Sequence, residues 1–188
     1  MVEELNPEFA TLLEAAENGD AEAMYQMAMF YSPAEGGSDM GKAIYWMKKA
    51  AEDSGDASMM ALYALMLRTA REHEASLYQL AKAAVFGDEN ARNWLKSGAF
   101  NEPMDFDDDK TVDIDEIYIK TIISEHFAKD ISEFNGDTEL ITGLELDSLD
   151  CVELIQALEQ EFEIKIPDED AEQWCIVNDV VNHIKENK

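Results

Sequence analysis

A short pattern that recurs three times constrains the fold of the first half of this 188-residue chain. In each copy an alanine pair is followed, a few residues later, by Gly-Asp, at residues 15–20, 50–56 and 83–88. The aspartates lie 36 and 32 residues apart, a period typical of stacked helix pairs. Glycine can end one helix and aspartate can cap the next. The pattern predicts an all-α solenoid of about six helices, with residues 89–96 closing the stack.

The segments between these copies carry further repeated features. Lys42-Ala43, Trp46 and Lys49-Ala50-Ala51 lie in the first repeat, and the more divergent second repeat keeps mainly Tyr78 and Lys82-Ala83-Ala84. On these features, residues 1–98 resemble a Sel1-like repeat domain, a relative of the tetratricopeptide solenoid. The resemblance implies a concave surface that binds other proteins. The alternative is a small helical domain filled by its own side chains, with methionines as adaptable core: Met24, Met27, Met29, Met59, Met60 and Met66.

The last third of the chain contains a serine at the start of an acidic amphipathic helix. Asp147 suits the N-cap, and Asp150 falls in the first turn, where a negative charge interacts favourably with the helix dipole and stabilises the helix. Apolar residues recur at helical spacing and predict one buried stripe: Leu149, Val152, Ile155, Leu158 and Phe162. Mostly off that stripe, and expected in solvent, are Asp150, Glu153, Glu159, Gln160 and Glu163. Ser148 is therefore expected at the first exposed position.

Two roles are open to such a serine. It can simply help to cap the helix. Alternatively, its hydroxyl can carry an attached anion, because free backbone N–H groups and the helix dipole favour a phosphodiester at a helix start. Three residues alone do not decide between these roles, so the surrounding sequence must.

Residues 146–162 are similar to the second helix of an acyl carrier protein, and residues 164–172 to the loop and short third helix that follow it. The resemblance covers residues 112–188 and implies a four-helix bundle. It also implies 4′-phosphopantetheine on Ser148, with Asp147 and Leu149 completing the recognition motif. The chain would then be a carrier protein and not an enzyme, holding acyl groups as thioesters on the cofactor.

The resemblance also implies the helices of the bundle. The first would span residues 113–127, a long loop would run through residues 135–137, a short helix would start near Asp168, and the last would span residues 177–185. Typical members shield a short acyl chain between these helices. The candidates for this role, which can equally be bundle core, are Leu140, Ile155, Leu158, Phe162, Ala171, Val177, Val180 and Val181.

The implied partners are a phosphopantetheinyl transferase and acyl-loading and acyl-transfer enzymes with basic docking surfaces. They would contact Val152, Glu153, Gln156 and Glu159. Many fatty-acid carriers have an exposed apolar residue in place of Gln156, so we expect partners that differ from those of the housekeeping pathway. Leu146 is bulkier than the residue usual before the motif. We therefore expect it to limit the movement of the phosphopantetheine arm across the surface next to Ser148.

The charge excludes several classes of partner. The formal net charge is −28: residues 1–102 hold 8 basic and 17 acidic residues, and the remainder 6 and 25. Such a chain repels nucleic acids and anionic membranes and attracts basic protein surfaces. It shows no apolar run of membrane length and no signal-peptide pattern, so we expect a cytoplasmic protein. Cys151 and Cys175 are accordingly expected to be free thiols.

Residues 99–111 read as an acidic linker between the two predicted domains, residues 1–98 and 112–188. Asp105, Asp107, Asp109 and Glu116 have the spacing of ligands in an EF-hand calcium loop. Lys110 occupies the position that needs glycine, however, and an acidic run is usually only a solvated linker. We therefore expect no specific metal site.

Two alternatives to an acyl carrier remain at this point. The first is an interaction or scaffold protein whose carrier-like bundle is never modified, against which the intact Asp147-Ser148-Leu149 argues. The second is a peptidyl carrier of a nonribosomal pathway. The acidic helix and residues 166–169 favour the acyl type over it without deciding the matter.

Overall fold

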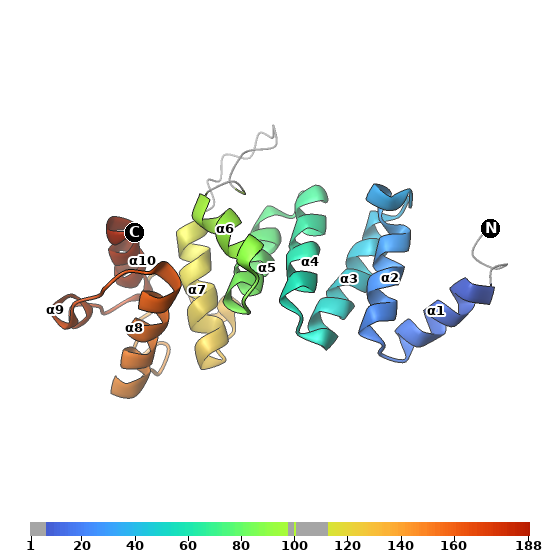
Figure 1. Ribbon diagram of the computed structural model, residues 1–188. Helices are drawn as coiled ribbons and strands as arrows, with labels where there is room; N and C mark the ends of the chain where they lie inside the picture. Colours follow the sequence, from blue (N-terminus) through green and yellow to red (C-terminus); the bar gives the residue numbers. More distant parts are fainter. Residues whose placement is uncertain (1–6, 98–99, 101–112) are drawn as a thin grey trace. The chain divides into compact units, whose positions relative to one another are not determined.

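The computed structural model describes residues 7–97, Phe100 and residues 113–188. It divides into two compact units, Met1–Phe100 and Asn101–Lys188, referred to as the first and second unit. Regular secondary structure in the described residues is helical, with an isolated antiparallel bridge between Glu139 and Ile176 and no strand (Figure 1). The predicted all-α fold is confirmed. Apart from Phe100, the predicted linker at 99–111 lies outside the described residues.

Six α-helices form the described part of the first unit, as the repeat period predicts. They are α1 (Pro7–Glu17), α2 (Ala21–Tyr31), α3 (Met40–Ser54), α4 (Ala57–Thr69), α5 (His73–Val85) and α6 (Glu89–Ser97), with a 3₁₀ turn at Pro33–Glu35. The main packing contacts join each helix to the next along the chain (Figure 1). This succession of nearest-neighbour contacts is the arrangement of a solenoid.

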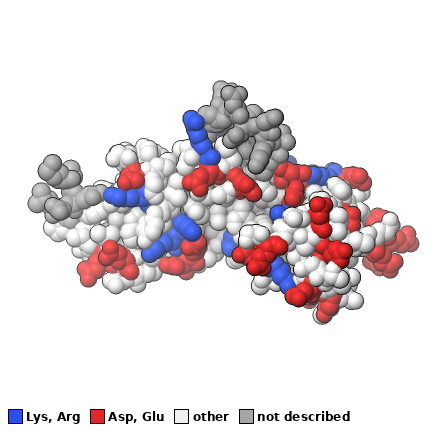
Figure 2. All heavy atoms as spheres, turned by 180° about the vertical axis from the view of Figure 1, so that it is seen from behind, with Lys and Arg blue, Asp and Glu red and all other residues white. Residues whose placement is uncertain are grey.

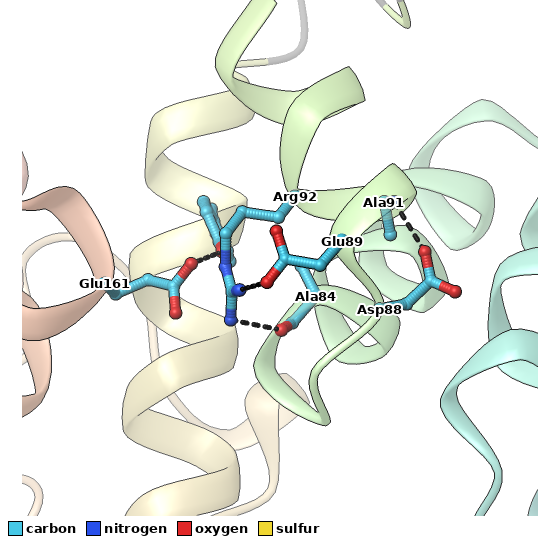
Figure 3. Close-up of polar contacts among 7 residues, drawn as sticks. Ala84, Asp88, Glu89, Ala91, Arg92 and Glu161 are labelled. Atoms are coloured by element: carbon cyan, nitrogen blue, oxygen red, sulfur yellow. Dashed lines mark hydrogen bonds and ion pairs between the residues drawn. The ribbon is translucent and has the colours of Figure 1, made fainter.

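The recurring glycine and aspartate have the predicted roles. The glycines adopt the left-handed conformation that ends a helix, with φ of 94° at Gly19, 64° at Gly55 and 100° at Gly87. Each aspartate accepts a hydrogen bond from the backbone N–H three residues on: Asp20 from Ala23 at 2.8 Å, Asp56 from Met59 at 3.1 Å and Asp88 from Ala91 at 2.7 Å. Figure 3 shows the cap at Asp88.

The small residues of the repeat lie where helices meet. Ala50, Ala83 and Ala84 are fully buried. Met24, Met27 and Met60 are also buried, whereas Met29, Met59 and Met66 are half-buried, so the methionines serve mainly as core. Arg92 of α6 donates hydrogen bonds to Glu89 at 2.8 Å and to the carbonyl of Ala84 in α5 at 3.1 Å (Figure 3). This arginine ties the last helix to its predecessor.

Four α-helices form the described part of the second unit: α7 (Ile114–Phe127), α8 (Ser148–Phe162), α9 (Asp168–Ala171) and α10 (Val177–Asn187). A 3₁₀ turn at Ile131–Glu133 begins the long connection from α7 to α8. Hydrogen bonds fix this connection to the start of α10: the carbonyls of Gly136 and Thr138 accept from Asn178 at 2.7 Å and Val177 at 3.0 Å. The connection is therefore an ordered part of the bundle.

Apolar side chains from the helices and from the long connection share one core. The proposed acyl-shielding residues Leu140, Leu158, Val177, Val180 and Val181 are buried in it, and Ile155, Phe162 and Ala171 are half-buried. Leu146 is only 3% exposed. Our expectation that Leu146 limits the movement of an arm is therefore wrong, because its side chain packs inward.

Candidate functional site

The segment around Ser148 is built by a reciprocal cap. Asp147 has an extended backbone, and its Oδ1 accepts hydrogen bonds from the N–H groups of Leu149 at 2.7 Å and Asp150 at 3.0 Å. Asp150 Oδ2 in turn accepts from the N–H of Asp147 at 2.9 Å. This capping box fixes the start of α8 and makes Ser148 its first helical residue, exposed to solvent. The predicted N-cap and the exposure of the serine are confirmed.

The buried face of α8 differs from the prediction. Leu154 and Leu158 are buried, with Cys151, Ile155 and Phe162 half-buried beside them. Leu149 and Val152, which we assigned to the buried stripe, are instead 65% and 47% exposed. Apolar residues occupy much of the helix circumference, so spacing alone admits two adjoining stripes, and packing against the other helices selects between them.

The acidic residues of α8 also differ among themselves. Glu153 is exposed as expected. Glu159 is half-buried, and it accepts hydrogen bonds from the backbone N–H of Ile166 at 2.9 Å and from Lys165 Nζ at 3.3 Å. The Ile166 bond, chiefly, and Lys165 hold the pKa of Glu159 below its usual value. Glu159 therefore anchors the loop after α8 instead of standing free in solvent.

Gln156 lies at the edge of a shallow groove at the C-terminal end of α8. The groove has a volume of about 490 Å³ and is lined by Gln156, Glu159, Gln160, Glu163, Ile164 and Lys165. Two amides, two carboxylates and one ammonium thus surround a single aliphatic side chain. This end of the helix offers hydrogen bonds and charge in place of an apolar anchor.

Cys151 lies one turn after Ser148 and is half-buried. Burial, together with the neighbouring carboxylates of Asp150 and Asp147, raises the pKa of its thiol. The thiol is therefore protonated near neutral pH and is a poor nucleophile. Cys151 and Cys175 are both free, as predicted.

The cap bears on how an anion can be held at this helix start. We expected free N–H groups to favour a phosphodiester, but those of Leu149 and Asp150 are already bonded to Asp147. Negative side chains also gather over the second unit (Figure 2). An exposed hydroxyl at a fixed helix end nevertheless fits a group that a covalent bond retains and that extends into solvent.

Neither a metal site nor a membrane span emerges from the described residues. No group of three or more His, Cys, Asp or Glu side chains among them could hold a metal ion. The calcium-loop candidates Asp105, Asp107 and Asp109 lie outside the described ranges, and Glu116 belongs to the first turn of α7. None of the helices in residues 7–97 and 113–188 is long and apolar enough to cross a membrane.

The second unit is thus a small helical bundle with an exposed serine at a capped helix start, and comparisons with known proteins show its family. Residues 118–184 match the family described as a phosphopantetheine attachment site. The chain is 49% identical over 67 residues to an acyl carrier protein of Clostridium acetobutylicum, which is 36% of this chain and 87% of that protein. It is 44% identical over 70 residues to that of Helicobacter hepaticus, covering 37% and 92%. It is 46% identical over 70 residues to that of Helicobacter pylori, covering 37% and 90%.

The chain belongs to the acyl carrier protein family, and its prosthetic group is 4′-phosphopantetheine. Family members interact with acyl-handling enzymes and with a phosphopantetheinyl transferase. These matches lie in the second unit. The resemblance of residues 1–98 to Sel1-like repeats therefore remains a prediction.

Proposed function

We propose that Ser148 is the attachment residue for 4′-phosphopantetheine and that the chain carries acyl groups between enzymes. The observation that carries this proposal is the exposed Ser148 at the capped start of α8, inside the region that matches carrier proteins. Asp147 and Leu149 would complete the motif that the transferase recognises. Leu149 is exposed and therefore accessible to it.

The residues around Ser148 would present its hydroxyl and leave the chemistry to partner enzymes. Asp147 and Asp150 hold the first turn rigid, so the transferase meets a preformed surface. The bound group supplies a terminal thiol that holds acyl groups as thioesters. Cys151 competes poorly for these groups, because its raised pKa keeps the thiol protonated.

We further propose the division into a Sel1-like domain (residues 1–98), a linker (99–111) and a carrier domain (112–188), in a cytoplasmic protein. The first domain would bind another protein and so select or hold a partner. Consecutive helix pairs with equivalent caps support this proposal, since such solenoids present extended binding surfaces.

Intact mass spectrometry tests the assignment of Ser148. The full chain is incubated with coenzyme A, Mg²⁺ and a phosphopantetheinyl transferase of broad specificity. We expect a gain of one phosphopantetheinyl group, mapped to Ser148, and none in Ser148→Ala with unchanged circular dichroism. Modification of Ser148→Ala would refute the assignment. No gain in the folded wild type, repeated with a transferase from the source organism, would favour the unmodified scaffold.

Two further assays address the domains and the cargo. Residues 112–188 alone should be modified as efficiently as the full chain. A folded but unmodified fragment would mean that the first domain takes part in transferase recognition. Loading the modified chain with acyl and with aminoacyl synthetases then separates an acyl carrier from a peptidyl carrier.

A further inference from the structure

The large apolar side chains that the second unit exposes lie close to Ser148 in the sequence. Among the described residues of this unit they are Ile141, Leu149 and Val152, which are 66%, 65% and 47% exposed. Single exposed apolar residues are common, but a group of them at one place marks an interaction surface. Leu149 and Val152 belong to the first two turns of α8. Ile141 instead precedes Ser148 by seven residues and needs an account of its own.

The backbone holds Ile141 near the motif. The N–H of Leu146 donates a hydrogen bond to the carbonyl of Leu140 at 3.1 Å, and Ser148 is two residues further on. Since each residue spans at most about 3.6 Å, the Cα atoms of Ile141 and Ser148 lie within roughly 15 Å of each other. Leu140 and Leu146 are each 3% exposed. The turn is therefore anchored in the core on both sides, and Ile141 is presented from a fixed backbone.

A transferase that acts on Ser148 must cover the surface around it. A standard protein interface buries about 800 Å² on each partner, which corresponds to a disc of about 16 Å radius. Ile141 falls within that radius. Glu145, four residues after Ile141, is exposed and pairs with Lys129 at 3.5 Å, and Glu153 of α8 is exposed as well. The complementary surface is therefore an apolar recess with a basic rim.

The other end of α8 makes this apolar contact more important. Gln156 and Gln160 line the groove there, and Ile164 is its one aliphatic side chain, so that end is mainly polar. The exposed apolar surface of this unit therefore lies mainly at the end that holds Ser148. A few buried anchors commonly dominate the binding energy of an interface.

We propose that Ile141 is a third apolar contact for the phosphopantetheinyl transferase, beside Leu149 and Val152, and that it positions Ser148 in the transferase site. The proposal rests on the function proposed for Ser148. It adds a residue outside the motif helix to the surface that the transferase recognises.

Steady-state modification of the full chain by the broad-specificity transferase tests this role. Ile141→Ser should lower kcat/KM about five- to tenfold, chiefly through KM, because a hydrophobic anchor is lost. Ile141→Val should stay within about twofold of the wild type, since it keeps most of the apolar surface. Phe86→Ser removes a side chain in the first unit that is 49% exposed and is the matched control. Equal rates for Ile141→Ser and the wild type, with unchanged melting temperatures, would overturn the proposal.

A second measurement separates this inference from the assignment of Ser148. Ser148→Ala is used as a competitive inhibitor while the transferase modifies the Clostridium acetobutylicum acyl carrier protein. The double variant, which carries Ile141→Ser in addition to Ser148→Ala, should have an inhibition constant about five- to tenfold higher than Ser148→Ala alone. An unchanged constant, or no inhibition by either chain, would overturn the role of Ile141. If the wild type is not modified, the proposed function fails, and the inhibition constants still decide on Ile141.

Discussion

The backbone N–H of Asp147 donates to Asp150 Oδ2 at 2.9 Å, while the backbone N–H of Asp150 donates to Asp147 Oδ1 at 3.0 Å. The two aspartates thus cap α8 reciprocally and hold Ser148 between them. Asp147 therefore has a structural role that is independent of its proposed role in transferase recognition. The two roles can be separated by experiment.

Asp147→Ala should lower the free energy of unfolding of the second unit by about 1 kcal/mol, because two backbone N–H groups lose their acceptor. Asp147→Asn keeps an accepting oxygen and should cost less. Urea unfolding of residues 101–188, followed by fluorescence of Trp174, its only tryptophan, measures both. If Asp147→Asn lowers the rate of modification by the transferase but leaves the free energy of unfolding unchanged, the transferase recognises the charge of Asp147. Equal stability of the Ala variant and the wild type would mean that the cap contributes nothing.

Features governed by local rules were predictable from the sequence. The caps at Asp20, Asp56, Asp88 and Asp147 all formed as predicted. A cap needs only a carboxylate and the N–H groups two or three residues away, so its geometry depends only on residues close in the sequence. The starts of α2, α4, α6 and α8 followed from these caps, and the ends of α1, α3 and α5 from the glycines.

Features that depend on distant residues were not predictable. Glu159 accepts a hydrogen bond from the N–H of Ile166, across the turn that follows α8. Helix periodicity does not predict that partner. Leu146 packs inward and Leu149 outward, although both lie next to Asp147 and Ser148, because the rest of the bundle decides which side is covered. Ile141 carried no pattern at all, and only its exposure identifies it.

Ala128 ends α7 in the left-handed conformation, with φ of 51°. Glycine adopts this conformation without steric cost. Ala128→Gly should therefore stabilise the second unit by about 0.5–1 kcal/mol, after the greater freedom of glycine in the unfolded chain is counted. The same substitution at Ala157, inside α8, should destabilise it by about 1 kcal/mol. Urea unfolding of residues 101–188 compares the two, and a shift of the same sign in both would contradict the argument.

Asp113 at the start of α7 forms an ion pair with Lys185 near the end of α10. Partial burial raises the pKa of Asp113, but hydrogen bonds from Lys185 and from the backbone N–H groups of Glu116 and Asp115 outweigh it and hold the pKa below 3.8. Because the folded-state pKa is the lower one, this contribution to stability is fully present above pH 3.8. It is lost as the pH falls through the folded-state value.

Asp113→Asn should therefore cost about 0.5–1 kcal/mol at pH 7, the size typical of a partly exposed ion pair. The difference from the wild type should shrink below pH 4. Urea unfolding of residues 101–188 between pH 3 and 7 tests this. Lys185→Gln should behave alike, and the double variant should lose less than the two single losses added together. A difference that is constant across the pH range would contradict the ion-pair account.

Gly37 lies in the loop between α2 and α3 because only a residue without a side chain fits there. A Cβ at this position would lie 2.4 Å from the carbonyl carbon and oxygen of Tyr31. These are backbone atoms at the end of α2 and cannot turn away, so Gly37→Ala should destabilise the first unit by about 1–3 kcal/mol through overpacking. Gly41, four residues on, is the matched control. A Cβ there meets only Asp39 Oδ1, at 3.5 Å.

Gly41→Ala should accordingly stabilise α3 by about 0.5–1 kcal/mol, since alanine is the better helix former. Hydrogen exchange of the full chain, resolved by peptide, reads the effect in each unit separately. Gly37→Ala should speed exchange in α2 and α3 and leave α8 unchanged, and Gly41→Ala should slow it in α3. If Gly37→Ala also speeds exchange in α8, the two units unfold together, and the division into independent domains is wrong.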